Sequence, residues 1–205
     1  MSETHAAIPR SRRGRPRNPG AEDRLFNAAL EEYGEHGWAG FTMDAVARRA
    51  GVGKSTIYLR WRDKDDLLSD AVAERRPNEE IADTGSLRSD LELLAENFFH
   101  FYLDAAGWAT LRIVIDAAGS PEPLGRFADA VTDLHREAMK IVGERAVARG
   151  DAPATDELDQ LWSCLYGSLL IQVLELRTRH RGLDGEQIAD RARVLADFVL
   201  TRVRA

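Results

Sequence analysis

Residues 42–61 read TMDAVARRAGVGKSTIYLRW, which predicts two short helices joined by a glycine turn. Thr42 is a favourable N-cap, because its hydroxyl can accept a hydrogen bond from a free backbone N–H group at the start of a helix. Val46 and Ala50 are four residues apart and lie on one apolar helical face. Gly51 follows that face, and glycine adopts without strain the left-handed conformation that commonly ends a helix.

The second predicted helix follows Gly53 and has a polar, cationic outer surface. Ile57 and Trp61 are four residues apart and are expected to face the core. From residue 48 to residue 64 the chain holds six cations and one acid, a net charge of +5, whereas the whole chain has a net charge of −6. This concentration of positive charge favours contact with phosphates. The arrangement is that of a helix-turn-helix, whose second helix enters the major groove of DNA.

The segment from about residue 24 to residue 72 resembles the DNA-binding domain of the tetracycline-repressor (TetR) family of bacterial transcription regulators. The resemblance rests on Ala28-Ala29, Tyr33, Gly37, Phe41-Thr42, Val46-Ala47, Ala50-Gly51-Val52, Tyr58, Lys64 and Leu67-Leu68. Two positions depart from the family pattern. Trp61 replaces the usual Phe in a core position, and Gly53 replaces a common Ser, so a side-chain N-cap is missing. The resemblance implies that double-stranded operator DNA is a partner.

Seven residues of this segment are predicted to contact DNA. Those assigned to bases and nearby phosphates are Lys54, Thr56, Tyr58 and Arg60, and those assigned chiefly to phosphates are Thr42, Ser55 and Lys64. These side chains are hydroxyl-bearing or cationic, as groups that bind phosphates and base edges usually are.

An N-terminal arm, residues 1–20, is rich in Pro and Arg and is predicted to be disordered in isolation. The segment Arg13-Gly14-Arg15-Pro16 resembles the core of an AT-hook, an extended arm that inserts arginines into the minor groove of A·T-rich DNA. We therefore add Arg13, Arg15 and Arg17 to the predicted DNA contacts. The alternative is a solvated tail that contributes only general attraction to DNA.

Gly53-Lys54-Ser55 also matches the end of a phosphate-binding P-loop, G-x-x-x-x-G-K-[ST]. The first glycine of that pattern would fall on Arg48, and a predicted helix precedes the motif where a P-loop requires a strand. The sequence contains no Cys-x-x-Cys, His-Glu-x-x-His or Gly-x-Ser-x-Gly pattern either. We expect no enzymatic activity, no catalytic or metal site and no cofactor.

The composition predicts an all-α protein with its charge divided between two ends. Ala, Leu, Glu and Arg dominate, and hydrophobic residues make up 44% of the 205 residues. Residues 1–76 hold 14 Lys and Arg against 12 Asp and Glu, whereas residues 77–205 hold 14 against 22. The basic end is the predicted nucleic-acid end. No apolar stretch reaches the roughly 20 residues that span a membrane, so a cytoplasmic location without membrane contact is expected.

The helical periodicity and its interruptions predict that the chain is divided into four parts. They are a basic arm (1–20), a three-helix helix-turn-helix domain (21–76), a linker (77–86) and a C-terminal helical domain (87–205). The first helix is expected to end at Gly37, and Ser86 is expected to cap a helix that begins at residue 87. Further helices are predicted at about 64–75, 108–118, 156–179 and 185–204, with a long one between Pro123 and Arg149.

The C-terminal part also resembles a subgroup of the TetR family, more loosely. The matching segments are Asp83-Thr84-Gly85-Ser86-Leu87-Arg88, Asp90-Leu91 and residues 144–150. The resemblance implies a ligand-binding and dimerisation domain whose last two helices form a four-helix interface with a second copy.

The predicted helix from residue 156 is apolar almost all round, which supports a homodimer independently of the resemblance. A helix that is apolar on every side has to be buried on every side, and a C₂-symmetric partner would cover the excess. The alternative is a central core helix of a monomer. Cys164 lies in this helix and is expected to be a small buried hydrophobic side chain.

Several aromatic side chains of the C-terminal domain are candidates for an effector pocket. Those predicted to line it are Phe98, Tyr102, Trp108, Phe127, Met139, Trp162 and Tyr166. Plain core packing is the alternative for each of them. His100 and His135 are candidates for a polar contact in the pocket, with a surface or satisfied histidine as the alternative.

These observations predict a ligand-responsive, homodimeric DNA-binding transcription regulator, specifically a repressor released by a small and largely apolar effector. One alternative is an architectural DNA-binding protein without an effector, against which the acidic C-terminal part argues. The other is a nucleotide hydrolase that uses Gly53-Lys54-Ser55, against which the motif's context argues.

Overall fold

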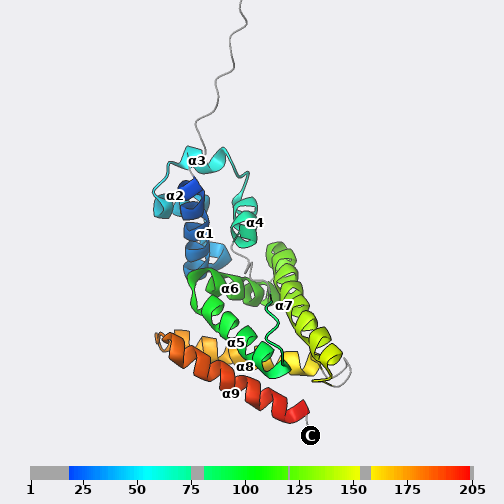
Figure 1. The fold of residues 1–205 in the computed structure, drawn as a ribbon. Helices are drawn as coiled ribbons and strands as arrows, with labels where there is room; N and C mark the ends of the chain where they lie inside the picture. Colours follow the sequence, from blue (N-terminus) through cyan, green and yellow to red (C-terminus); the bar gives the residue numbers. More distant parts are fainter. Residues whose placement is uncertain (1–18, 75–80, 120, 153–157, 204–205) are drawn as a thin grey trace, which may run out of the picture.

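The computed structural model describes residues 19–74, 81–119, 121–152 and 158–203, and these residues form nine helices and no strand (Figure 1). The all-α prediction is therefore confirmed. The helices are α1 (Pro19–Gly40), α2 (Met43–Ala50), α3 (Lys54–Tyr58), α4 (Lys64–Glu74), α5 (Leu87–Leu103), α6 (Ala105–Gly119), α7 (Pro121–Arg149), α8 (Leu158–Thr178) and α9 (Gly185–Val203). Figure 1 shows α1–α4 at one end of the molecule and α8 and α9 at the other.

Helix ends lie where the sequence chemistry places them. Gly37 has φ 63° and ψ −173°, so the backbone leaves the helical conformation at the predicted end of the first helix. The Ser86 hydroxyl accepts a hydrogen bond from the Ser89 backbone N–H at 3.2 Å and caps α5 as expected. Glu122 is extended (φ −94°, ψ 129°), so regular helix in α7 begins after it, close to Pro123.

Two hydrophobic cores hold the molecule together. One combines α5, α7, α8 and α9 with Leu111 of α6, and Leu91 and Leu165 are among its fully buried side chains. The other is built on α1–α4, and it also contains Ala109 and Ile113 of α6 and Phe127 of α7. The N-terminal core thus extends past the predicted linker into the first part of the C-terminal domain.

A hydrogen-bonded joint fixes α6 against α1. The backbone carbonyl of Gly34 accepts hydrogen bonds from Trp108 Nε1 and Arg112 Nη1, each at 2.9 Å. The Tyr33 hydroxyl donates to Asp116 Oδ2, also at 2.9 Å. A Cβ atom on Gly34 would lie 3.1 Å from Trp108 Cδ1, so glycine allows this close approach. These contacts link α6 directly to α1.

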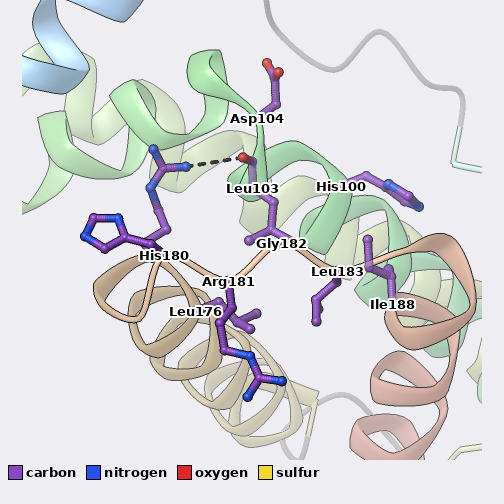
Figure 2. A pocket seen from close by; sticks show the side chains of 10 residues that line it. His100, Leu103, Asp104, Leu176, His180, Arg181, Gly182, Leu183 and Ile188 are labelled. Atoms are coloured by element: carbon purple, nitrogen blue, oxygen red, sulfur yellow. Dashed lines mark hydrogen bonds between the residues drawn. The ribbon is translucent and has the colours of Figure 1, made fainter.

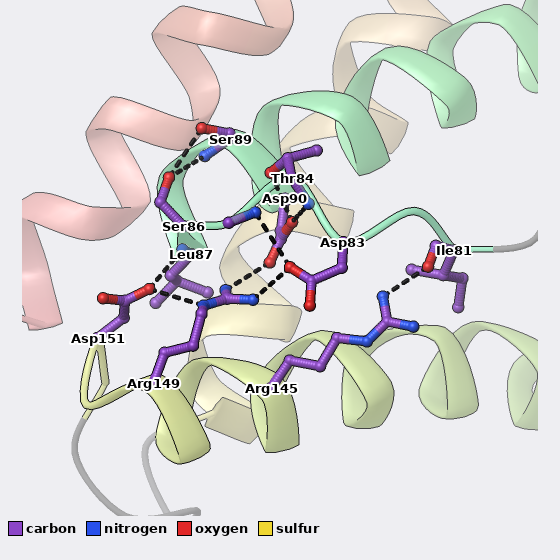
Figure 3. A network of polar contacts seen from close by, with 11 residues as sticks. Ile81, Asp83, Thr84, Ser86, Leu87, Ser89, Asp90, Arg145, Arg149 and Asp151 are labelled. Atoms are coloured by element: carbon purple, nitrogen blue, oxygen red, sulfur yellow. Dashed lines mark hydrogen bonds and ion pairs between the residues drawn. The ribbon is translucent and has the colours of Figure 1, made fainter.

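A second polar network ties residues 81–86 to the C-terminal domain (Figure 3). Arg149 at the end of α7 pairs with Asp83, Asp90 and Asp151 at 2.6, 2.6 and 3.0 Å. Thr84 donates from its backbone N–H and its hydroxyl to Asp90 Oδ1. Burial opposes ionisation of Asp90, but the hydrogen bonds from Thr84 and Arg149 outweigh it and lower its pKa. Asp90 is thus a buried, ionised carboxylate with all its partners in place.

We expect Asp90→Ala to lower the free energy of unfolding by about 2 kcal/mol, because it leaves buried donors of Thr84 and Arg149 without their acceptor. Asp83→Ala is the matched control, since Asp83 also pairs with Arg149 but its side chain is 51% exposed. An exposed ion pair contributes about 0–1 kcal/mol. Urea denaturation measures both values, and equal losses in the two variants would contradict this account of the network.

Candidate DNA-binding surface and effector domain

The turn between α2 and α3 has the predicted capping geometry. The Thr42 hydroxyl accepts a hydrogen bond from the Ala45 backbone N–H at 3.2 Å and starts α2. Gly51 has φ 67°, and its backbone N–H donates to carbonyls in the last turn of α2. Gly53 precedes α3 and makes no side-chain cap, as expected for a residue without a side chain. The helix-turn-helix is thus built from the residues that predicted it.

The five-residue helix α3 is held from below by two buried side chains. Ile57 is fully buried and Trp61 is 4% exposed, and the Trp61 indole donates to Asp70 Oδ2 at 2.8 Å. The predicted base-contact residues all lie on the exposed side: Lys54, Thr56, Tyr58 and Arg60, together with Ser55. Figure 1 shows α3 at the end of the molecule farthest from α8 and α9. The structure therefore brings these five predicted residues onto one accessible surface.

Leu59 belongs to the same surface, although the sequence reasoning missed it. Its side chain is 85% exposed and it follows Tyr58, which is 55% exposed. The available signal was its position between Ile57 and Trp61, which turns it away from the core face. An exposed apolar side chain beside polar ones suits contact with the methyl group of thymine.

Acids from α1 neutralise part of the positive charge that the sequence count assigns to residues 48–64. Arg49 donates to Glu32 and Glu35 of α1 at 2.9 and 2.5 Å and pairs with Glu31 at 3.5 Å. Its hydrogen bonds to Glu35 and Glu32 raise its pKa. Arg49 is therefore a structural residue that links α2 to α1, and its charge is not free to attract phosphate. A count along residues 48–64 could not include the acids of α1.

Two predicted DNA contacts also have partners within the protein. Lys54 forms an ion pair with Asp44, and both side chains remain largely exposed. Arg60 lies 3.6 Å from Glu22 of α1. Exposed pairs of this kind are worth about 0–1 kcal/mol, so a phosphate or a base can replace the carboxylate at little cost.

Lys64 has a different environment. Its ammonium group donates to the backbone carbonyls of Trp38 and Phe41 at 2.8 and 3.3 Å and lies 3.9 Å from the centre of the Trp38 ring. Burial lowers its pKa. Lys64 therefore holds the end of α1 against α4, and its predicted phosphate contact stays a prediction. The arm residues Arg13, Arg15 and Arg17 lie outside the described residues.

In the C-terminal domain, four of the predicted effector residues form one aromatic cluster around His135. They are Phe98, Tyr102, Trp162 and Tyr166. The Trp162 and Tyr166 rings are stacked with centroids 4.7 Å apart, and Phe98 meets His135 edge to face at 5.1 Å. The cluster joins α5, α7 and α8, and we refer to it below as the aromatic cluster.

A buried hydrogen-bonded chain runs through the aromatic cluster. The Tyr102 hydroxyl lies 3.0 Å from His135 Nε2 and 2.7 Å from the Tyr166 hydroxyl. Burial raises the pKa of Tyr102 and of Tyr166, and it lowers the pKa of His135 to about 4. The three groups are therefore neutral at pH 7 and offer polar contacts inside an apolar surround. His135 is a satisfied core histidine, which was the alternative considered for it.

The other three predicted effector residues are not aromatic members of this cluster. Met139 is buried in the same core as the aromatic cluster. Trp108 belongs to the α1–α6 joint, where its ring also faces Arg177 at 4.4 Å. Phe127 packs in the N-terminal core. The structure thus brings four of the seven residues together, with Met139 and Trp108 in or against the same core and Phe127 in the other core.

The outer faces of α8 and α9 expose large apolar side chains. Ile171 of α8 is 60% exposed, and Val194 and Phe198 of α9 are 68% and 56% exposed. The helix α8 is therefore not buried on every side within one chain. Cys164 is exposed as well, so its predicted burial does not hold within one chain. It lies seven residues before Ile171, on the same outward face, whereas Leu165 points inward.

The described residues carry no group of three or more His, Cys, Asp or Glu side chains placed to hold a metal ion. Among the same residues, no helix combines the length and apolarity needed to cross a bilayer.

Two family models match the chain over most of its length. Residues 25–71 match the model of bacterial regulatory proteins of the tetR family, and residues 81–192 match a tetracyclin repressor-like C-terminal domain. Among curated proteins, the HTH-type transcriptional regulator AqdR of Rhodococcus erythropolis is 34% identical over 157 residues, which cover 76% of this chain and 75% of AqdR. The uncharacterised regulator YdeS of Bacillus subtilis is 27% identical over 169 residues, 80% of this chain and 83% of YdeS.

Solved structures share the fold. FadR from Bacillus subtilis in complex with stearoyl-CoA superposes with a TM-score of 0.70 at 16% identity, covering 87% of this chain and 97% of FadR. MexZ, a repressor responsible for antibiotic resistance in Pseudomonas aeruginosa, gives a TM-score of 0.68 at 18% identity, covering 91% and 96%. The matched family and these relatives are regulators of transcription and not enzymes. The chain therefore belongs to the tetracycline-repressor family of transcription regulators.

Proposed function

We propose that this regulator is a homodimeric repressor that holds operator DNA through α3 and is released when a small, largely apolar effector binds its C-terminal domain. The observation that carries the DNA-binding part is the exposed surface of α3, which places Thr56, Tyr58 and Arg60 outward over a buried Ile57. In a dimer, two such helices would enter successive major grooves about 34–36 Å apart on a pseudo-palindromic site.

The aromatic cluster supports the effector part of the proposal. Its rings offer stacking surfaces, and the chain Tyr166–Tyr102–His135 offers polar contacts in an apolar surround. A relative of the same fold, FadR from Bacillus subtilis, was solved with stearoyl-CoA, a ligand with a long apolar chain. An apolar effector with a few polar atoms is the class that suits such a cluster.

The α1–α6 joint supplies the route from effector to DNA. Tyr102 of the aromatic cluster lies in the last turn of α5, next to the corner that leads into α6. Trp108 and Arg112 of α6 both hold the Gly34 carbonyl of α1. An effector that shifts α6 would therefore rotate α1 and change the separation of the two α3 helices. A coupling free energy of about 1–3 kcal/mol, or ~5–150-fold in affinity, is enough for release.

Selection of bound sequences from random duplexes, followed by fluorescence anisotropy on the enriched site, tests DNA recognition directly. We expect Arg60→Ala to lower affinity for that site by about 1–3 kcal/mol and to relax the preference at one base pair. Arg62→Ala is the matched control, because Arg62 is 80% exposed but pairs with Asp63 and Asp66 beyond the end of α3. Equal effects in the two variants would show that only net charge matters.

The effector part has its own test. A screen of small apolar compounds by thermal shift should yield a compound that stabilises the protein and also lowers its operator affinity. An architectural DNA-binding protein would give DNA binding that no stabilising compound affects.

A further inference from the structure

A pocket opens at the corner where α5 meets α6, against the end of α8 and the loop to α9 (Figure 2). It has a volume of about 630 Å³ and lies apart from the aromatic cluster. The apolar part of its wall consists of Leu103, Leu176, Leu183 and Ile188. A volume of this size accommodates an organic molecule rather than a single ion.

The main polar residue of the wall is Arg177. Its guanidinium group is partly buried and forms no ion pair with a carboxylate of the described residues. Its Nη1 donates to the Leu103 carbonyl at 3.2 Å, and the group lies 4.4 Å from the centre of the Trp108 ring. Burial lowers its pKa. The one carboxylate of the pocket, Asp104, acts on Arg177 only through space and accepts the Ala106 backbone N–H instead. Most N–H groups of Arg177 therefore have no acceptor among the described residues.

Two other partly buried arginines of this protein are supplied with acids, whereas Arg145 and Arg191 donate to the Ile81 carbonyl and to Gln172 Oε1. Arg49 has three glutamates, and Arg149 has three aspartates. A partly buried charge without a counter-ion is costly, and a carboxylate or a phosphate is the usual partner of a guanidinium. A cation near the end of a helix also complements the helix dipole, but that effect needs no burial against apolar side chains.

Figure 2 shows how the lining side chains are placed around the pocket. His180 lies on the same side of the view as the hydrogen bond to the Leu103 carbonyl. Leu183 and Ile188 lie on the other side. In this view the side chains of Arg181 and His100 point outward. The His180 ring points away from Leu183 and Ile188 in this view, so Arg177, a partly buried residue of the pocket wall, is the cation best placed for a ligand.

From this geometry we infer that the pocket binds an organic anion, with its carboxylate or phosphate head on Arg177 and its apolar body against Leu183 and Ile188. The site is separate from the proposed effector site in the aromatic cluster. Because Arg177 also covers Trp108, which holds the Gly34 carbonyl, an anion that draws the guanidinium toward itself loosens the α1–α6 joint. This last consequence rests on the proposed function, whereas binding of the anion does not.

Calorimetry on the full chain without DNA tests the site with three probes of equal chain length, used below their micellar concentrations. They are octanoate, octyl phosphate and 1-octanol. We expect at least one of the anions to bind about tenfold or more tightly than 1-octanol, since hydrogen bonds to a charged partner exceed those to a neutral one. The anion that binds more tightly shows whether the site prefers a carboxylate or a phosphate head group. Equal affinity of all three probes, or no binding of either anion, would overturn the inference.

Variants locate the binding. Arg177→Gln should abolish the preference for the anion, and Arg179→Gln, the same change on an exposed arginine outside the pocket wall, should keep it. Leu183→Glu, at a partly exposed position, places a like charge in the pocket and should weaken the anions more than 1-octanol. Persistence of the anion preference in both Arg177→Gln and Leu183→Glu would contradict the site. Operator affinity measured with and without the anion then tests the coupling on its own.

Discussion

Phe198→Asp is expected to convert the proposed dimer into a monomer and to lower operator affinity by about 10²–10⁴-fold. The side chain is 56% exposed on α9, beside Val194 at 68%, and Ile171 of α8 adds a third exposed apolar group. A second copy related by a two-fold axis would bury this face, and a carboxylate buried among apolar side chains without a partner is strongly unfavourable. Loss of the dimer removes the gain from binding two half-sites at once, which sets the size of the effect.

Analytical ultracentrifugation and fluorescence anisotropy measure the two parts of this prediction on one sample. Ile115→Asp is the matched control, because Ile115 is 48% exposed on α6 and lies away from the outer faces of α8 and α9. It should remain dimeric and bind DNA. A Phe198→Asp protein that sediments as a dimer, with an unchanged circular dichroism spectrum, would exclude this face as the interface.

The helices and their ends could be predicted because their causes are local. Thr42, Gly51 and Ser86 act on backbone groups within four residues, so the sequence alone indicates where the helices begin and end. The spacing of Ile57 and Trp61 likewise defined the buried side of α3. These are the features that the structure reproduces without correction.

The charges around α3 could not be assigned from the sequence because their partners come from another helix. Arg49 looked like part of a phosphate-binding patch, yet the glutamates that hold it lie 14 to 18 residues earlier in α1. Lys64 is bound by carbonyls 23 and 26 residues away. Only the packing of α1 against α2 and α4 shows that Arg49 is held by acids and that Lys64 has acceptors within the protein.

The aromatic cluster was predicted in part, for a similar reason. Phe98 and Tyr102 are four residues apart on α5, and Trp162 and Tyr166 are four apart on α8, so each pair shares a helical face. That the two faces meet around His135 depends on how α7 crosses them. Trp108 was assigned to the same pocket on its residue type, whereas its indole N–H faces α1 because α6 is part of the joint.

Acidification is expected to destabilise the protein through His135, because the ring is 3% exposed and burial lowers its pKa to about 4. In the unfolded chain the pKa is about 6.5, so between these two values the unfolded state binds more protons than the folded state. The stabilisation is fully present above pH ~6.5 and is lost as the pH falls through about 4. A shift of this size corresponds to about 3 kcal/mol by pH 4.

Urea denaturation from pH 7.5 to pH 4 measures this loss, and His135→Gln separates it from the titration of carboxylates. Glutamine can keep a hydrogen bond to Tyr102 but does not titrate, so its free energy of unfolding should fall less steeply over the same range. Parallel curves for the two proteins would contradict the neutral, buried state of His135. Converging curves would mean that the folded protein holds His135 in its neutral form, so that protonating this ring within the aromatic cluster opposes folding.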